Sequence, residues 1–342
     1  MTVSWKPPRD WLKITAFDVH AAGEPLRIIS DGFPQLRGRR ILSKRKFLQQ
    51  NYDFLRRASL WEPRGHADMY GCILTKKERS DSDFGVVFMH NQGYGTMCGH
   101  GIIGLVTFVL ETGMVEAGTD LPILKIDTAA GQVMARAVFK RGRVREVSFR
   151  NVPSFVYALD REVDVPGLGL IRIDIAFGGA FYAFCRAEDL NISLSPENFR
   201  ALIDLGMRIK KAVINTIPVR HPFEEDLSFL FGTIIVGAPL GQGHHSRNVC
   251  IFADGEVDRS PTGTGVSARA ALHYARGELR LGESFIVESI LGTCFKGTVK
   301  KITTFGPYPA VIPEVAGSAF ITGRSELYIS SKDPLRYGFL LR

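Results

Sequence analysis

The chain has 342 residues, of which 45% are hydrophobic and 23% charged, and its formal net charge is +8. This is the composition of a soluble globular protein, and the length predicts about two domains. No apolar run approaches the roughly 18 residues that span a membrane. The stretch from Met1 to Leu12 lacks the apolar segment of a signal peptide, so we expect a cytoplasmic protein without a membrane partner.

The cysteines and the basic clusters exclude two further classes of protein. Five cysteines, at positions 72, 98, 185, 250 and 294, have neither the even number of a disulfide framework nor the close pairs of a zinc site. Basic residues cluster at 37–40, 44–46 and 208–211, but no nucleic-acid-binding signature accompanies them. We therefore expect no nucleic-acid partner, and only a mild attraction for anionic small molecules.

Short segments rich in β-forming residues recur along the chain, separated by glycines and charged turns. In the first half we expect strands at 12–19, 73–74, 85–89, 123–126 and 133–139, with helices at 44–57 and 101–111. In the second half we expect strands at 170–175, 180–185, 233–236, 249–252 and 285–287, with helices at 196–214 and 266–274. Many strands around one apolar helix per half predict an α+β fold with antiparallel or mixed sheets.

One short motif occurs twice. Residues 97–101 read MCGHG and precede an apolar helix, and residues 261–265 read PTGTG and precede another. Cys98 and Thr262 therefore occupy equivalent positions (262 − 98 = 164), and Gly113 and Gly277, the expected helix-ending glycines, share this offset. Further matches join 86–90 with 250–254, 126–131 with 287–292, and 17–23 with 173–179.

A repeat of this length predicts two homologous domains rather than a solenoid. We expect the first domain to span 1–150 and the second 151–324, with the linker at 151–153. The last residues, from about 325 to 342, are expected to return to the first domain, because the repeat is exhausted by then. In this arrangement Cys98 and Thr262 face each other across a cleft between the domains.

The reactive groups in the two motifs differ. A thiol at a helix N-terminus faces the positive end of the helix dipole, so we expect Cys98 to have a lowered pKa and to act as a general base. Thr262 offers only a hydroxyl at the equivalent place. Two helix N-termini in one cleft would bind a carboxylate, and Asp258 is either the partner of a substrate ammonium or a turn residue. Abstraction of an amino acid's α-proton then needs no cofactor.

Longer motifs identify a family. The chain contains DVH at 18–20, GEP at 23–25, EPRGH at 62–66, MCGHG at 97–101 and DRSP at 258–261, and with these it resembles the proline racemase family over nearly its whole length. A departure occurs at Ala21 and Ala22, where the family usually has threonine and glycine. The resemblance implies two pseudo-symmetric α+β domains of the diaminopimelate epimerase type, each sheet wrapped around a central helix, with the active site in the interdomain cleft.

The resemblance also implies the site residues. It makes Cys98 the catalytic base and places Gly99, His100, Asp258, Gly263 and Thr264 against the substrate, without a cofactor. No metal is expected, because the pairs His20 with Glu24 and His244 with His245 lack a third ligand of convincing spacing.

Position 262 divides the family. Racemases and epimerases carry a second cysteine there, and the family's dehydratases carry threonine, so Thr262 implies dehydration of trans-3-hydroxy-L-proline to Δ1-pyrroline-2-carboxylate. The implied partners are hydroxyproline and a second copy of the chain in a homodimer. Two alternatives stay open: a proline racemase or hydroxyproline 2-epimerase that reprotonates with another group, and a non-catalytic protein that binds proline analogues.

Overall fold

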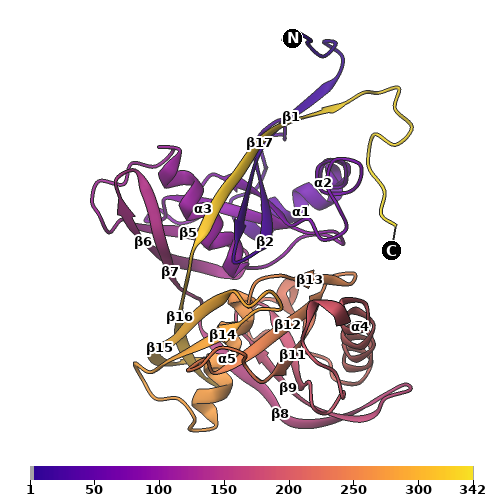
Figure 1. Ribbon diagram of the computed structural model, residues 1–342. Coiled ribbons are helices and arrows are strands. Elements are labelled where there is room, and N and C mark those ends of the chain that lie inside the picture. Colours follow the sequence, from indigo (N-terminus) through magenta and orange to yellow (C-terminus); the bar gives the residue numbers. More distant parts are fainter. Residues whose placement is uncertain (1–3, 342) are drawn as a thin grey trace.

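The computed structural model describes residues 4–341 and has an α+β fold with mostly strands and few helices. Its early and late parts form two bodies, one above the other in Figure 1. Residues 1–3 and 342, which belong to the expected first domain, lie outside the described range.

The upper body holds the early strands and the first helices of the chain (Figure 1). Its elements are β1 (Leu12–Ala21), β2 (Glu24–Asp31), α1 (Ile41–Asn51), α2 (Asp53–Leu60), β3 (Gly71–Thr75), β4 (Phe84–Met89), α3 (Gly99–Glu111), β5 (Ile123–Thr128), β6 (Gly131–Lys140), β7 (Arg143–Arg150) and, from the end of the chain, β17 (Ala319–Ile329). Helix α3 is buried from Gly99 to Leu110 and packs against β1, β2, β6, β7 and β17. It is apolar on all sides because the sheet surrounds it.

The lower body repeats this plan around helix α5. Its elements are β8 (Ser154–Val165), β9 (Gly169–Phe177), β10 (Phe181–Arg186), α4 (Phe199–Thr216), β11 (Leu230–Gly237), β12 (Ser246–Phe252), β13 (Glu256–Asp258), α5 (Gly263–Ala275), β14 (Ser284–Glu288), β15 (Cys294–Phe305) and β16 (Tyr308–Gly317), with short 3-10 helices at Pro196–Asn198 and Glu225–Leu227. Helix α5 packs against β8, β9, β15 and β16, and α4 covers β11 and β12.

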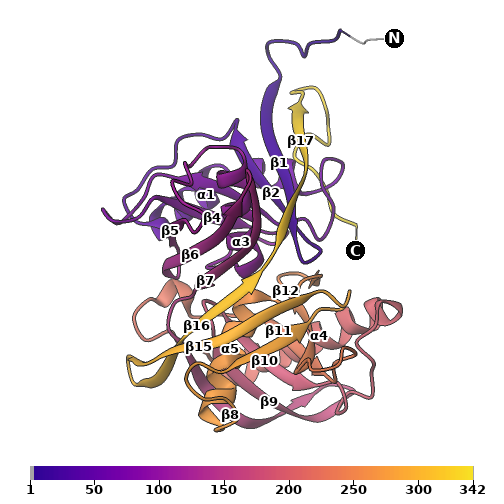
Figure 2. The same ribbon diagram turned by 60° about the vertical axis from the view of Figure 1, so that its left-hand side comes forward.

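The pairing of strands is mixed, as the sequence predicts. Four pairs are parallel (β2 with β3, β4 with β5, β10 with β11, β12 with β14), and the other described pairs are antiparallel. Strand β16 pairs with β15 and also with β7 of the upper body. The chain then crosses back as β17, which lies beside β1 in Figure 2 and pairs with it from Ala319 onward.

The central helices have the predicted ends. After the last residue of α3 and of α5 comes one capping residue and then a glycine in the left-handed region. The φ is 69° at Gly113 and 72° at Gly277. A residue without Cβ adopts this conformation at no steric cost. The two helices also keep the offset of the sequence repeat at their first and last residues.

Other helices and strands differ from those predicted. The single helix expected at 44–57 is wrong, because Tyr52 leaves the helical region (φ −138°, ψ 19°) and Asp53 starts α2 with a new first-turn carboxylate. Strands β2, β7, β8, β13, β15, β16 and β17 were not expected from the sequence. Several of them, such as β7 with the sequence RVREVSFR, have charged residues on an exposed face. No helix of residues 4–341 is long and apolar enough to cross a membrane.

Candidate active site

The first residues of α3 and α5 meet at the junction of the two bodies. Cys98 is the N-cap residue of α3 and Thr262 is that of α5. A Cβ atom built on Gly99 would lie 2.5 Å from the Cα of Gly263, and one built on Gly263 would lie 2.7 Å from the Cα of Gly99. Only glycine fits at both positions, because any side chain would push the two backbones apart. The expected convergence of two helix N-termini is therefore present.

Thr262 has a strained backbone. Its φ is 65° and its ψ is 90°, and a β-branched residue rarely adopts a positive φ. Its N–H donates to Ser260 Oγ at 3.1 Å, and its carbonyl accepts from the Val266 N–H at 2.7 Å. Such strain costs of order 1–3 kcal/mol and is concentrated at functional sites. The loop thus holds Thr262 in a conformation that its own preferences oppose.

Both motifs line one small cavity of about 20 Å³. Its walls are formed by Tyr70, Met97, Cys98, Gly99, His100, Tyr182, Phe231, Cys250, Phe252, Asp258, Thr262, Gly263 and Thr264. All seven site residues expected from the sequence are in this set. A space of this size holds about one water molecule, so the structure is a closed form in which a proline ring does not fit.

Four aromatic residues of the cavity wall were not expected from the sequence. Tyr70 immediately precedes β3, and Tyr182 lies in β10, where its hydroxyl is 2.7 Å from Thr264 Oγ1. The rings of Phe231 and Phe252 stack with their centroids 5.2 Å apart. These aromatic residues carry no local motif, and only the pairing of distant strands brings them to the cavity. Cys250 is fully buried in β12 and also lines the cavity.

Burial reverses the expected pKa shift of Cys98. The Gly101 N–H donates to its Sγ at 3.3 Å, and the nearby Tyr70 hydroxyl also favours the thiolate; both lower its pKa. Burial acts more strongly, and together with the nearby Asp258 and Glu24 it raises the pKa of the thiol well above its usual value. The prediction of a lowered pKa is therefore wrong for this closed form, because removal from water penalises the thiolate more than the helix N-terminus stabilises it.

Burial likewise favours the neutral form of the other groups around the cavity. It raises the pKa of Asp258 to about 6, although the Ser260 N–H donates to Asp258 Oδ1 at 2.7 Å. It lowers the pKa of His100 to about 3, and the Nδ1 of this neutral ring lies 3.2 Å from Cys98 Sγ. Burial also raises the pKa of Glu24 well above its usual value. Burial thus opposes charge on each of these groups, but a pKa of about 6 leaves the Asp258 carboxylate mostly ionised at neutral pH.

The hydroxyl of Thr262 faces the acidic groups. Its Oγ1 is buried and makes no hydrogen bond of normal geometry within residues 4–341. It nevertheless approaches the Asp258 carboxyl and the Cys250 thiol closely enough to lower the pKa of both.

Polar contacts hold the two bodies together around the cavity. Glu24 Oε2 accepts from the Arg259 N–H at 2.7 Å, and the Arg259 guanidinium pairs with Asp68 at 2.7 Å. Thr96 Oγ1 donates to the Gly179 carbonyl at 2.6 Å. Farther out, exposed ion pairs join α1 and its N-cap residue to the lower body, Arg40 with Glu224 and Lys46 with Asp226.

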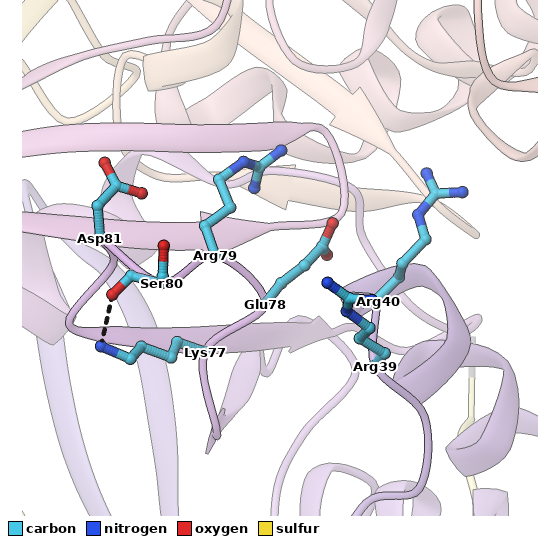
Figure 3. Close-up of a pocket in the computed structure, with 7 residues that line it drawn as sticks. All are labelled: Arg39, Arg40, Lys77, Glu78, Arg79, Ser80 and Asp81. Carbon is cyan, nitrogen blue, oxygen red and sulfur yellow. Dashed lines mark hydrogen bonds between the residues drawn. The ribbon is translucent and has the colours of Figure 1, made fainter.

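A larger, open pocket of about 750 Å³ lies elsewhere, where Arg39, Arg40, Lys77, Glu78, Arg79, Ser80 and Asp81 line it (Figure 3). Its polar groups already hold the local structure. Glu78 Oε2 accepts from the Ile41 N–H at the start of α1, Arg79 pairs with Asp127, and Lys77 donates to the Ser80 carbonyl. None of the expected site residues lines this pocket, so we place the candidate active site at the smaller cavity.

No group of three or more histidine, cysteine, aspartate or glutamate side chains within residues 4–341 is arranged to hold a metal ion.

Comparison with known proteins identifies the family. The family model described as proline racemase matches residues 16–340, so the chain belongs to this family. It is 49% identical over 341 residues to a trans-3-hydroxy-L-proline dehydratase from Colwellia psychrerythraea, a match that covers 99% of this chain and 96% of that protein. It is 41% identical over 329 residues to a proline racemase from Clostridioides difficile, a match that covers 96% of this chain and 98% of that protein.

A solved structure has the same fold. The crystal structure of a hydroxyproline epimerase from Agrobacterium vitis, with bound trans-4-hydroxy-L-proline, matches with a TM-score of 0.90 at 31% identity and covers 96% of each chain. Relatives with different names thus share this architecture, and the activity of this chain has to be argued from its own site.

Proposed function

We propose that this member of the proline racemase family removes water from trans-3-hydroxy-L-proline and yields Δ1-pyrroline-2-carboxylate. One observation carries the proposal: the N-cap position that faces Cys98 holds Thr262, whose hydroxyl is too weak an acid to reprotonate a carbanion as a thiol does. The identity to a relative named trans-3-hydroxy-L-proline dehydratase supports it.

The substrate carboxylate would bind between the two helix N-termini. The two helices start side by side at Gly99 and Gly263, so their free backbone N–H groups would converge on one bound carboxylate. These donors stabilise the charge that flows from Cα into the carboxylate as the α-proton leaves. In this proposal His100 and Thr264 contact the substrate from the two helices, and no cofactor takes part.

Asp258 would pair with the substrate ammonium. Burial raises its pKa to about 6, and a bound ammonium would further favour the carboxylate. The same cation would offset the two acids, Asp258 and Glu24, that raise the pKa of Cys98. Substrate binding thereby helps to generate the thiolate that acts as the base.

The chemistry follows from the ring geometry of the substrate. In trans-3-hydroxy-L-proline the α-hydrogen and the 3-hydroxyl lie on the same face, because the carboxylate and the hydroxyl lie on opposite faces. Cys98 removes the α-proton from that face. With Thr262 unable to reprotonate the other face, the carbanion expels the 3-hydroxide and becomes an enamine, which tautomerises to the cyclic imine.

We also propose that the two bodies are domains that move apart to admit the substrate. In this proposal the first domain comprises residues 1–150 and the C-terminal residues that return to it, and the second domain comprises residues 151–324. The pairing of Ala319 with Ala21 supports a return that starts slightly before the expected residue 325. The cavity of about 20 Å³ supports opening, and closure excludes water from the reaction. A homodimer and a cytoplasmic location remain predictions; light scattering on the purified protein tests the first.

Incubation with candidate substrates in D2O tests the function. We expect trans-3-hydroxy-L-proline to give the imine, and L-proline and 4-hydroxyproline to be turned over poorly or not at all, since they lack a 3-hydroxyl. Deuterium at Cα in both isomers would instead identify a racemase or epimerase. Binding without imine formation and without exchange would identify a non-catalytic binding protein. Efficient racemisation of L-proline would overturn the proposal.

A further inference from the structure

A hydroxide ion is a poor leaving group, and the proposed dehydration therefore needs an acid. Because the α-hydrogen and the 3-hydroxyl share one ring face, this acid must lie on the Cys98 side of the cavity. Of the cavity-lining groups near Cys98 that can hold a proton, Asp258 is assigned to the substrate ammonium in the proposed function, which leaves His100 and Tyr70. The hydroxyls of Tyr182 and Thr264 share a hydrogen bond. Thr264 lies at the start of α5, so this pair is on the Thr262 side of the cavity.

His100 is poorly suited to donate. Burial lowers its pKa to about 3, so the ring is neutral. Its ring nitrogens lie against the Cys98 sulfur, with Nδ1 at 3.2 Å and Nε2 at 3.7 Å. A neutral imidazole is also a much weaker acid than a phenol.

Tyr70 has the required position. Its side chain is 2% exposed, and its ring packs edge-on against the His100 ring with centroids 5.0 Å apart. A Cβ atom built on Gly95 would lie 2.5 Å from the Tyr70 hydroxyl, so the glycine makes room for it. The hydroxyl lies close enough to Cys98 Sγ to lower the pKa of the thiol, and Tyr70 forms part of the cavity wall. Burial raises the pKa of Tyr70 well above its usual value, so it starts the reaction protonated.

We propose that Tyr70 is the catalytic acid that protonates the departing 3-hydroxyl, an inference that rests on the proposed dehydration. The Cα–H bond breaks and its proton goes to Cys98 Sγ. The electron pair forms the Cα–C3 double bond as the C3–O bond breaks, and the Tyr70 proton converts the departing oxygen to water. The enzyme is left with a Cys98 thiol beside a Tyr70 phenolate.

The closeness of the two residues then allows the site to be reset. The thiol proton passes to the phenolate, which restores the Cys98 thiolate and the Tyr70 phenol without a proton from solvent. The net change is the transfer of one proton from Cα to the leaving hydroxide. Base and acid are thus regenerated in one step.

A change of leaving group tests the role. Tyr70→Phe keeps the ring packing and removes only the hydroxyl. With trans-3-hydroxy-L-proline we expect kcat to fall at least about 100-fold, the usual contribution of a general acid. With trans-3-chloro-L-proline, whose chloride leaves without a proton, we expect the variant and the wild-type protein to react at similar rates.

Isotope exchange gives a second readout. In D2O the Tyr70→Phe carbanion should live long enough for the exchanged Cys98 thiol to return deuterium, so recovered trans-3-hydroxy-L-proline becomes labelled at Cα with retained configuration. The wild-type protein should release imine with little such label.

Tyr182→Phe is the matched control, because it removes the other cavity phenol, the one bonded to Thr264. It should slow the hydroxy and chloro substrates by the same factor. Equal losses for both substrates in Tyr70→Phe, or an unchanged kcat, would refute the role of Tyr70. A wild-type protein that forms no imine would refute the dehydration itself.

Discussion

Gly99 and Gly263 begin the two central helices and approach each other so closely that neither position has room for a Cβ atom. Residues far apart in the chain thereby bring two helix N-termini to one point. The contact is between backbones, which do not rotate away as a side chain does. It therefore fixes how far the two bodies close.

A methyl group at this contact should impair catalysis more than folding. We expect Gly263→Ala to lower kcat/KM at least about 100-fold, because a displacement of about 1 Å at reacting groups has effects of this size. The circular dichroism spectrum should stay native. Gly93→Ala is the control, since a Cβ atom there meets nothing within 4 Å. Equal activity of the two variants would show that the helix contact does not position the site.

Cys98 is proposed as the only base. Cys98→Ser should lower kcat by about 100-fold to 10000-fold, the range for loss of a general base, because an alcohol ionises far less readily than a thiol. Its melting temperature should remain close to that of the wild-type protein, since the two side chains are similar in size. Imine formation from trans-3-hydroxy-L-proline measures the loss. Near-normal turnover of the serine variant would exclude the mechanism.

Thr262→Cys should restore a second acid opposite Cys98. We expect α-epimerisation of hydroxyproline or proline to appear, at the expense of imine formation, because a thiol can reprotonate the opposite face of the carbanion. Chiral chromatography of the recovered substrate measures it. Thr262→Ser is the control, which keeps a hydroxyl and should not epimerise; epimerisation by both variants would contradict the argument.

The positive φ of Thr262 also has an expected effect on stability. Thr262→Gly should change the free energy of unfolding by less than about 1 kcal/mol, because relief of strain offsets the lost side-chain contacts. Thr233→Gly is the comparison, a buried strand residue whose hydroxyl likewise lacks a partner within residues 4–341. It should lose about 2 kcal/mol, since no strain is relieved. Denaturant unfolding distinguishes the two, and equal losses would argue against strain.

The raised pKa of Asp258 leads to a prediction of how activity depends on pH. Its raised pKa of about 6 means that the carboxyl is protonated below that pH and can no longer pair with the substrate ammonium. We expect kcat/KM to fall about tenfold for each pH unit below that value. The drop should be steeper if Glu24, whose pKa is also raised, titrates in the same range. A profile of kcat/KM from about pH 4 to about pH 8 measures it, and a flat profile through pH 6 would contradict the assignment.

Cysteine alkylation reports on the closed form. Cys98 is buried and has a raised pKa, whereas Cys294 is the least buried of the five cysteines, although its pKa is also raised. Iodoacetamide should therefore label Cys294 first in the absence of substrate, and mass spectrometry of the digested protein identifies the labelled position. Rapid labelling of Cys98 at neutral pH would indicate that the open form dominates in solution.

The sequence by itself determined the features that depend on local patterns. Glycines at 113 and 277 predicted where the central helices end, because a left-handed capping residue is a local requirement. The repeat predicted that Cys98 and Thr262 are equivalent, and the motifs predicted the family. Strands with charged residues on an exposed face, such as β7 and β17, were not predicted. Their buried and exposed residues alternate in the structure, but the many polar residues mask this pattern in the sequence.

The tertiary structure decided the properties that depend on burial. It placed Tyr70, Tyr182 and Cys250 at the cavity with residues from the two helix starts, although no motif joins them along the chain. It also reversed the expected pKa shift of Cys98. The effect of a helix N-terminus can be read locally, but desolvation depends on all the groups packed around the thiol, and only the complete fold brings those groups together.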